Sequence, residues 1–363
     1  MPFPASTTGR FGLLASRLLL SAVCLSWAAC APAPEDSTAS DMSSGEVSGT
    51  TEAVESAVER PEFALAIHGG AGVIPKDMAP EKVAAYEAAL ESALTHGRDR
   101  LAAGASALDV VEEVVKMLED APEFNAGKGA VFTNDGRNEL DAAIMDGRDK
   151  SCGAVARMTT VKNPITVARG VMERSRHVFM VGEGAEAFAD ELGVERVDKD
   201  YFFTQRRYDQ WQKALERERE AEAQAEKDKH GTVGCVALDK EGNLAAATST
   251  GGMTNKRFGR IGDVPVIGAG TYADNETAAI SCTGKGEEFI RHNVAHAVSS
   301  RMALAGESLQ AAAEAVIHGT LAEGDGGLIA VGHDGSIAMV FNSPGMFRGA
   351  ADATGRFDVA IWE

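Results

Sequence analysis

The chain has 363 residues, of which 44% are hydrophobic, and its formal net charge at pH 7 is −19. This hydrophobic content is enough for one large folded domain or two small ones. Such an acidic chain is not expected to bind nucleic acid, because phosphate backbones attract clustered Lys and Arg side chains. The five cysteines are scattered and form no C-x-x-C pair, so we expect neither a disulfide framework nor a structural zinc site.

Residues 1–29 have the layout of a secretory signal peptide. Arg10 and Arg17 precede an apolar run over 18–27 that is too short to cross a membrane as a stable helix. The run ends in Ala-Ala-Cys30, which resembles a bacterial lipoprotein signal in which Cys30 becomes the lipidated first residue. The sequence therefore predicts an exported protein, either periplasmic or a membrane-anchored lipoprotein. Two different outcomes also fit: ordinary cleavage before Cys30, giving a secreted protein, and a cytoplasmic protein with a misassigned start.

Residues 30–61 are rich in Ala, Pro, Ser, Thr and Glu and contain few large apolar side chains. Such a segment cannot bury enough surface to fold, so we predict a disordered tether. From residue 62 onward, runs of strands and runs of helices follow one another without strict β-α-β alternation. This order indicates an α+β fold with stacked sheets covered by helices.

The expected elements are read from apolar periodicity and turn residues. The strands are expected at 62–68, 130–133, 139–146, 153–158, 177–181, 232–238, 244–250, 277–282, 327–332 and 336–341. The helices are expected at 81–103, 106–119, 165–175, 183–192, 287–305 and 308–319. Ser106 is a suitable N-cap for the second of these helices. Segment 208–231 is densely charged, is helix-prone over 208–229 and lacks an apolar stripe, which predicts a mobile linker.

The step from Gly231 to Thr232 is the most informative feature of the chain. The charged run ends there, and an apolar strand begins at Thr232. If the bond between the two residues is cut, the Thr232 hydroxyl gains its own α-amine as a base. With a pKa near ~8, that amine accepts a proton at neutral pH. A turn at Gly242-Asn243 pairs this strand with 244–250, so we expect Thr250 beside Thr232. Taken alone, the Gly-Thr step also fits a strand that starts after a loop.

Two further clusters could belong to a site. Arg260 and Asp263 lie in a Gly-rich turn and together could hold the α-carboxylate and α-ammonium of one amino acid. A surface ion pair would show the same spacing. The stretch 68–71, His-Gly-Gly-Ala, is similar to an esterase oxyanion loop. The chain has no G-x-S-x-G elbow to accompany it, so we expect a structural glycine turn near the site.

Several ordered stretches together resemble the plant-type asparaginase and isoaspartyl peptidase family of N-terminal-nucleophile hydrolases. The resemblance spans about 62–346 and is carried by LAIHGGAG, FNAGKGAVFTNDGRNELDAAIMDG, HGTVGCVALDKEGNLAAATSTGGMTNK, GRIGDVPVIGAG, SCTGKGEEFIR and GGLIAVGHDG. It implies a four-layer αββα sandwich that is autoprocessed between Gly231 and Thr232. The α subunit would then cover 62–231 and the β subunit 232–363, and the mature enzyme would be a dimer of αβ heterodimers.

The resemblance also implies roles for individual residues. Thr232 would be the nucleophile, and the other catalytic residues would be Thr250, Thr283 and Gly284. The substrate would be bound by Arg260, Asp263, Thr283, Gly284, the Gly286 carbonyl and Asn125. No cofactor is expected for catalysis. A structural sodium ion would be held by the backbone carbonyls of Leu118, Glu119, Ala121, Phe124, Ala126 and Lys128.

The predicted activity is hydrolysis of L-asparagine and of β-aspartyl (isoaspartyl) dipeptides to L-aspartate. The expected partners are these small molecules, with a membrane reached only through a lipid on Cys30. Glycosylasparaginases of the same fold typically have Asp before the nucleophile, where this chain has Gly231. A threonine endopeptidase of this fold and an inactive lipoprotein that binds amino acids are rival interpretations. The inactive lipoprotein is disfavoured by the joint presence of Thr232, Thr250, Arg260, Asp263 and Thr283.

Overall fold

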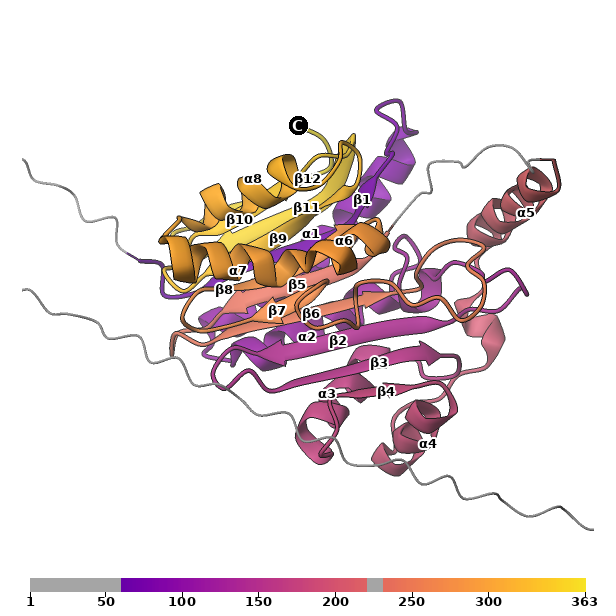
Figure 1. The fold of residues 1–363 in the computed structure, drawn as a ribbon, viewed down its shortest axis with the longest axis horizontal. Helices are drawn as coiled ribbons and strands as arrows, with labels where there is room; N and C mark the ends of the chain where they lie inside the picture. Colours follow the sequence, from indigo (N-terminus) through magenta and orange to yellow (C-terminus); the bar gives the residue numbers. More distant parts are fainter. Residues whose placement is uncertain (1–59, 221–230) are drawn as a thin grey trace, which may run out of the picture. The chain divides into compact units, whose positions relative to one another are not determined.

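Two β-sheets lie at the centre of residues 60–220 and 231–363, the part of the chain that the computed structural model describes. The larger sheet has the strand order β12-β11-β1-β5-β6-β2-β3-β4 and the smaller has the order β10-β9-β8-β7 (Figure 1). The strands of the larger sheet are β1 (Ala64–Gly72), β2 (Leu140–Asp146), β3 (Cys152–Met158), β4 (Phe179–Val181), β5 (Val233–Leu238), β6 (Leu244–Thr250), β11 (Gly345–Asp352) and β12 (Phe357–Ala360). Those of the smaller sheet are β7 (Thr271–Ala273), β8 (Ala278–Gly284), β9 (Gly326–Gly332) and β10 (Ile337–Phe341).

The helices divide between the two sheets. Three helices pack against the larger sheet, namely α1 (Pro80–Ala102), α2 (Ala107–Asp120) and α3 (Pro164–Arg174), and α4 (Glu183–Leu192) packs beside α3 and β4. Three others contact the smaller sheet, as Figure 1 shows for α6 (Gly286–His292), α7 (Val294–Ala305) and α8 (Leu309–Gly319). The two sheets also contact each other directly, through β8 and β9 against β1 and β5. No helix among the described residues combines the length and the apolar character that crossing a bilayer needs.

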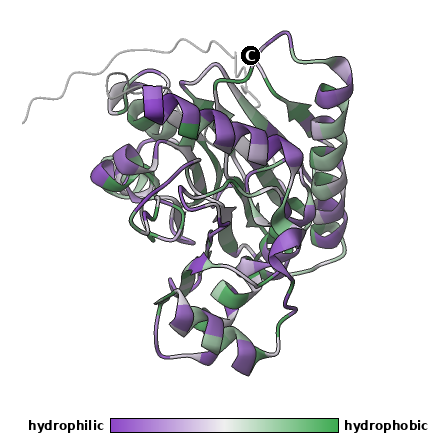
Figure 2. Ribbon diagram, turned by 90° about the vertical axis from the view of Figure 1, so that its right-hand side faces the viewer, coloured by the Kyte–Doolittle hydropathy of each residue, from purple (hydrophilic) through white to green (hydrophobic). Residues whose placement is uncertain are grey.

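The central strands are apolar on both faces because each face is covered. In β1, Leu65 and Ile67 belong to the hydrophobic cluster under α1 and α2, whereas Ala64 and Ala66 face the smaller sheet. Successive side chains of a strand point to opposite faces, so β1 contributes to both clusters. The small alanine side chains let the two sheets approach closely. Figure 2 shows the hydrophobic residues gathered in the strands and the hydrophilic residues on the outer sides of the helices.

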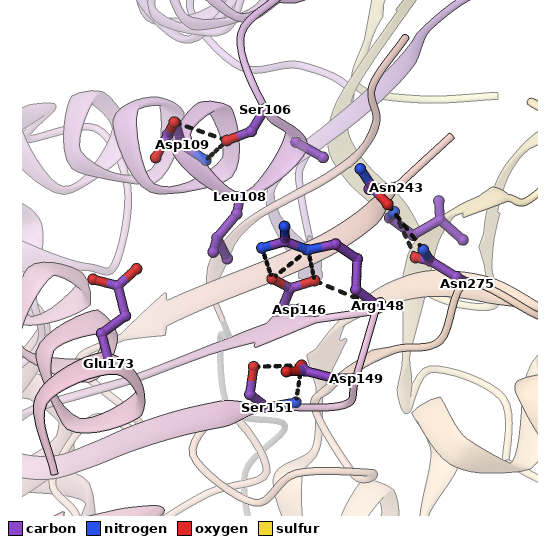
Figure 3. A network of polar contacts seen from close by, with 12 residues as sticks. Ser106, Leu108, Asp109, Asp146, Arg148, Asp149, Ser151, Glu173, Asn243 and Asn275 are labelled. Atoms are coloured by element: carbon purple, nitrogen blue, oxygen red, sulfur yellow. Dashed lines mark hydrogen bonds and ion pairs between the residues drawn. The ribbon is translucent and has the colours of Figure 1, made fainter. Parts of the chain in front are cut away.

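The hairpin of β5 and β6 is fixed at the end opposite to Thr232. The side chain of Asn275 donates from Nδ2 to Asn243 Oδ1 at 3.2 Å and accepts from the Leu244 amide at 2.8 Å. In the neighbouring turn, Arg148 forms a forked ion pair with Asp146 (Figure 3). These polar contacts satisfy turn groups that would otherwise be buried without partners.

The N-cap expected at the start of α2 is present. The Ser106 hydroxyl oxygen accepts the Asp109 amide at 3.2 Å (Figure 3), and helix α2 buries a face that contains Val110, Val114 and Leu118. A side-chain acceptor at this position satisfies one of the amides that a helix leaves unpaired in its first turn. The serine and the apolar spacing together explain why the sequence predicted this helix within one residue at each end.

Several other elements differ from the expectation, among them the short strand β7, which was not predicted. The helix expected over 287–305 is split into α6 and α7, because Asn293 has a positive φ of 50°. Strands β11 and β12 were not predicted, and β11 pairs along β1. The strand expected at 130–133 is reduced to one isolated bridge between Phe132 and Asn138. Pairing partners far away in the chain decide such elements, and local periodicity does not show them.

The mobile linker expected over 208–231 is wrong for its first part. Helix α5 spans Gln205–Glu220, and Tyr208 and Trp211 pack against Phe132. The side chain of Arg207 is buried and donates from Nε to the Gly129 carbonyl at 2.7 Å. The apolar contacts of this helix lie in its first turns, whereas Glu218 near its end forms an ion pair with Arg257, so its sequence has no continuous apolar stripe. The rest of the expected linker, 221–230, and the whole of 1–59 lie outside the described residues.

Candidate active site

Thr232 lies directly before β5, in the middle of the larger sheet, and is 6% exposed. Strand β5 is antiparallel to β6 with Val233 opposite Ser249, so Thr232 and Thr250 are neighbours across the pair. The Thr232 hydroxyl donates to Thr250 Oγ1 at 3.3 Å. The hairpin therefore brings these two hydroxyls together, as the turn at Gly242-Asn243 predicted.

The carbonyl of Gly231, on the bond expected to be cut, is held by two donors. Asn125 donates from Nδ2 to the Gly231 oxygen at 2.6 Å, and the Thr250 hydroxyl donates to the same oxygen at 3.2 Å. The Gly252 amide in turn donates to Thr250 Oγ1 at 3.0 Å. Two donors aimed at one carbonyl oxygen can stabilise the negative charge that develops there when a nucleophile attacks. This arrangement suits attack by the adjacent Thr232 hydroxyl.

Gly70 in β1 lies against the same peptide bond. A Cβ atom on Gly70 would lie 2.8 Å from the Gly231 Cα and 3.1 Å from the Thr232 nitrogen, and its φ is 110°. Only glycine fits both this conformation and this close approach. The expected glycine turn is instead a bulge within strand β1, and Gly70 in this bulge does lie near the site. The neighbouring His68 also contacts the site, because its Nδ1 lies 3.0 Å from the Thr232 carbonyl oxygen.

Thr283 and Gly284 are the last two residues of strand β8. Thr283 is fully buried, and its Oγ1 accepts the Ala71 amide at 3.1 Å. A Cβ on Gly284 would lie 2.1 Å from the Asp325 carbonyl oxygen, so no larger residue fits there. The Thr283 hydroxyl still has its proton to donate, and a hydroxyl beside a backbone N–H is a suitable pair of donors for an oxyanion.

Arg260, Asp263 and Gly286 converge as expected. A Cβ on Gly286 would lie 2.8 Å from Arg260 Nη2 and 2.9 Å from Asp263 Oδ1. The Arg260 guanidinium binds Glu287 through two hydrogen bonds of 2.8 and 2.9 Å. Glu287 thus holds one edge of the guanidinium, and the other edge can bind a carboxylate. Sequence reasoning missed Glu287, although its place directly after Gly286 in the matched stretch was a usable signal.

Asp263 is buried and lacks a partner for one of its oxygens. The side chain is 5% exposed, and its Oδ2 atom has no hydrogen-bond partner among the described residues. Burial raises the pKa of Asp263 to about 7, and the nearby Arg260 offsets only part of this effect. An unpaired buried carboxylate oxygen beside a guanidinium is a suitable site for an α-ammonium group. A bound ammonium would supply the missing partner.

One small cleft brings these groups together. It is lined by Gly231, Thr232, Thr250, Gly252, Arg260, Gly262, Asp263 and Gly284. Asn125, Thr283 and Gly286 lie in contact with its walls. The cleft thus places the Thr232 hydroxyl, the Thr250 hydroxyl and the Arg260–Asp263 pair around a common space. The buried Lys256 lies beside Gly252 of this cleft, and its Nζ lies 3.9 Å from Asp141 and 4.0 Å from Glu139. Sequence reasoning missed this buried cation.

The loop expected to bind sodium is tightly coiled around two glycines. A Cβ on Gly129 would lie 2.0 Å from the Phe124 carbonyl oxygen, and one on Gly127 would lie 2.3 Å from that of Glu119. The Ala121 and Ala126 carbonyls accept the amides of Phe124 and Gly129. Each carbonyl has a second lone pair, so this donor set fits a hard cation that prefers neutral oxygens. The described residues contain no group of three His, Cys, Asp or Glu side chains that could hold a metal.

Glu119 contributes its side chain as well as its carbonyl. The side chain is fully buried, and its Oε1 accepts the Ser249 hydroxyl at 2.6 Å and the Ile165 amide at 3.2 Å. Burial raises the pKa of Glu119 to about 8. The hydrogen bond with Ser249 holds strand β6 in place one residue before Thr250. Sequence reasoning could not find this role, because a buried glutamate looks the same as a surface one in the sequence.

Known proteins are similar to this chain over most of its length. A family described as asparaginase matches residues 61–361. The chain belongs to this asparaginase family. It is 50% identical over 292 residues to the isoaspartyl peptidase of Escherichia coli (strain K12), covering 78% of this chain and 91% of that protein. It is 44% identical over 324 residues to a probable isoaspartyl peptidase/L-asparaginase 2 of Arabidopsis thaliana, covering 83% and 99% of the two chains. An isoaspartyl peptidase of Salmonella typhimurium is 51% identical over 292 residues, covering 78% and 93%.

The raised pKa of Asp263 predicts a pH-dependent affinity for amino acids. Protonation of Asp263 as the pH falls below about 7 removes the counter-charge of a bound α-ammonium. The dissociation constant of L-aspartate should therefore rise by about tenfold per pH unit below about 7. Titration calorimetry across this range measures the slope. Asp263→Asn should bind weakly at every pH and show a flat profile; an equally flat profile in the unmutated protein would contradict the assignment.

Proposed function

We propose that this asparaginase-family chain is an autoprocessed threonine hydrolase that acts on L-asparagine and on isoaspartyl dipeptides, with L-aspartate as a product. The observation that carries the proposal is the environment of Thr232. Its hydroxyl contacts Thr250, and the preceding Gly231 carbonyl is held by two hydrogen-bond donors. The names of the related proteins, isoaspartyl peptidase and isoaspartyl peptidase/L-asparaginase, support the choice of substrates.

Maturation follows from this arrangement. The Thr232 Oγ attacks the Gly231 carbonyl carbon, and Asn125 and Thr250 stabilise the oxyanion. The peptide bond breaks as an ester to Oγ forms, and the Thr232 nitrogen takes up a proton. Water then hydrolyses the ester, leaving a carboxylate on Gly231 and a free Thr232 with an α-amine and a hydroxyl. The released amine is the base that the uncleaved chain lacks.

Turnover reuses the same hydroxyl. Arg260 binds the substrate α-carboxylate, and Asp263 with the Gly286 carbonyl binds the α-ammonium. The Thr232 amine removes the hydroxyl proton while Oγ attacks the β-carbonyl, and Thr283 and Gly284 stabilise the oxyanion. The proton passes to the leaving ammonia or peptide amine. Water hydrolyses the resulting ester and releases L-aspartate.

The finer architecture is part of the proposal. Contacts of α1–α3 with the larger sheet, of the sheets with each other, and of α7 and α8 with the smaller sheet support a four-layer αββα sandwich. We propose α and β subunits of 62–231 and 232–363, a dimer of αβ heterodimers, and no cofactor for catalysis. We further propose a structural sodium ion on the carbonyls of Leu118, Glu119, Ala121, Phe124, Ala126 and Lys128. It would brace the loop that carries Asn125.

Two rival functions fit less well. A glycosylasparaginase-like hydrolase is disfavoured by Gly231, where that branch typically has Asp. A binding protein without catalysis is disfavoured because Thr232 and Thr250 line the same cleft as Arg260 and Asp263. A protein that only binds an amino acid would need the Arg-Asp pair but not a buried threonine hydroxyl beside the Gly231 carbonyl.

Replacement of the nucleophile tests the proposal directly. Thr232→Ala should leave one uncleaved chain without activity, because no hydroxyl remains to attack the Gly231 carbonyl. Thr232→Ser should still cleave, and Thr320→Ala, at the exposed end of α8, should behave as the unmutated protein. Mass spectrometry and N-terminal sequencing measure the outcome, together with an assay of ammonia or aspartate release. A small fragment that does not begin Thr-Val-Gly-Cys would contradict the mechanism.

Loss of the carboxylate anchor should affect turnover but not maturation. Arg260→Ala should lower kcat/KM for L-asparagine by about 10- to 150-fold, which corresponds to ~1.5–3 kcal/mol for a charge-assisted contact. Cleavage at Thr232 should continue, since it needs no α-carboxylate. Arg291→Ala, which removes an exposed arginine of the neighbouring helix α6, is the matched control. If both variants show the kinetics of the unmutated enzyme, Arg260 does not anchor the substrate.

We also propose export, with residues 1–29 removed and Cys30 lipidated. Lipid on Cys30 would hold the enzyme on a membrane through 30–61, provided that at least two acyl chains are attached, because one chain binds only marginally. Cys30→Ser should then move activity from the membrane pellet to the soluble fraction. A soluble unmutated protein that lacks 1–29 would instead indicate simple secretion, and retention of Met1 in the larger fragment would rule out export.

A further inference from the structure

A buried chain of polar side chains leads away from the nucleophile. His68 Nδ1 lies 3.0 Å from the Thr232 carbonyl oxygen, and His68 Nε2 lies 2.9 Å from Ser281 Oγ. Ser281 Oγ is 2.8 Å from Thr248 Oγ1, which accepts from the Thr271 hydroxyl at 2.7 Å. All four side chains are fully buried. Their strands, β1, β6, β7 and β8, belong to both sheets, so the chain runs between the two sheets.

The direction of these hydrogen bonds is fixed by the first acceptor. A peptide carbonyl can only accept, so His68 must carry its proton on Nδ1. Burial lowers the pKa of His68 to about 3, partly offset by the bond to Thr232, so the ring is neutral and Nε2 must accept. Ser281 therefore donates to His68. Because a hydroxyl has one proton, Ser281 accepts from Thr248, and Thr248 accepts from Thr271. Each of the four linked side chains therefore donates one hydrogen bond to the next group in the line.

Gly234 in β5 makes this contact possible. A Cβ atom there would lie 2.0 Å from Ser281 Oγ and 2.4 Å from His68 Nε2. Any side chain at position 234 would thus occupy the space in which the histidine and the serine meet. The line of polar side chains ends at Thr271. The Thr271 hydroxyl also lies 3.1 Å from the carbonyl oxygen of Val264, but its single proton is donated to Thr248. The polar chain therefore runs from the backbone of Thr232 to Thr271 in β7.

We propose that His68 is a positioning residue for Thr232, held in its Nδ1–H tautomer by the hydroxyl chain of Ser281, Thr248 and Thr271. The hydrogen bond from His68 fixes the peptide plane after Thr232 and with it the direction of the attacking hydroxyl. This inference rests on the proposed role of Thr232 as the nucleophile. His68 itself touches neither the scissile carbonyl nor the anchor pair, so it acts through Thr232 alone.

Removal of one hydroxyl tests the inference. In Ser281→Ala, His68 Nε2 loses its donor and only the Thr232 carbonyl still favours the Nδ1–H tautomer, so kcat for L-asparagine should fall by about 5- to 100-fold, the loss expected when a buried partner is left unpaired. KM should stay within about twofold, because Arg260 and Asp263 are untouched. Autocleavage should slow as well. Thr248→Val, which leaves Ser281 without its donor, should shift kcat in the same direction.

The protein offers a matched control for loss of a buried hydroxyl. Thr277 Oγ1 and Ser299 Oγ lie 2.7 Å apart, are buried, and do not reach His68. Ser299→Ala should therefore lower stability to a similar extent but change kcat by less than about twofold. Equal kcat values for Ser281→Ala and Ser299→Ala, each measured on the folded and cleaved fraction, would overturn the positioning role.

The tautomer can be measured without activity. In nitrogen-15 spectra of the mature enzyme, the His68 signal, assigned by its absence in His68→Gln, should show a protonated Nδ1 and an unprotonated Nε2. It should not titrate between about pH 5 and about pH 9, whereas a histidine in solution would gain its charge near pKa ~6.5. A protonated Nε2 or a titrating ring would overturn the inference. If Thr232→Ala still cleaves, the proposed function fails instead, whatever the tautomer.

Discussion

The antiparallel pairing of β5 with β6 is the constraint on which the site depends. It places Thr232 opposite Thr250 and leaves the Gly231 carbonyl at the end of the strand, where Thr250 and Asn125 can reach it. A slip of one residue would turn the Thr232 side chain to the other face of the sheet. Burial of both faces of these strands opposes such a slip, because it would move each side chain from one packed hydrophobic cluster into the other. Packing and chemistry thus require the same register.

The site also contains charged and polar groups that cost free energy to bury. Asp263 keeps an oxygen without a partner among the described residues, and its pKa is raised to about 7. Arg260 is held by Glu287, so the guanidinium is already oriented before a ligand binds. Groups preorganised in this way lose little conformational entropy on binding. Burial of the Asp263 carboxylate costs free energy, and a ligand that places a positive charge beside it would offset this cost. The same burial would therefore favour binding of a zwitterion.

Local structure was largely readable from the sequence. The cap at Ser106, the turn before Leu244 and the alternating apolar residues predicted most helices and strands to within a few residues. The start of helix α5 was missed, because its few apolar contacts lie in its first turns against Phe132. The split at Asn293 and the strands β11 and β12 were also missed. The helix split depends on one left-handed residue and the strands on a distant pairing, and neither leaves a periodic pattern.

The sequence by itself determined the nature of the site: a threonine after a glycine at a strand start, an Arg-Asp pair in a glycine-rich turn, and ordered motifs of one enzyme family. Only the tertiary structure decided how these groups meet. It brought His68 to the carbonyl of Thr232, 164 positions away, and Asn125 to Gly231 across 106 positions. It also decided which carboxylates are buried and therefore which pKa values rise. Such effects depend on the surroundings of a side chain, and those are set by the packing of the two sheets.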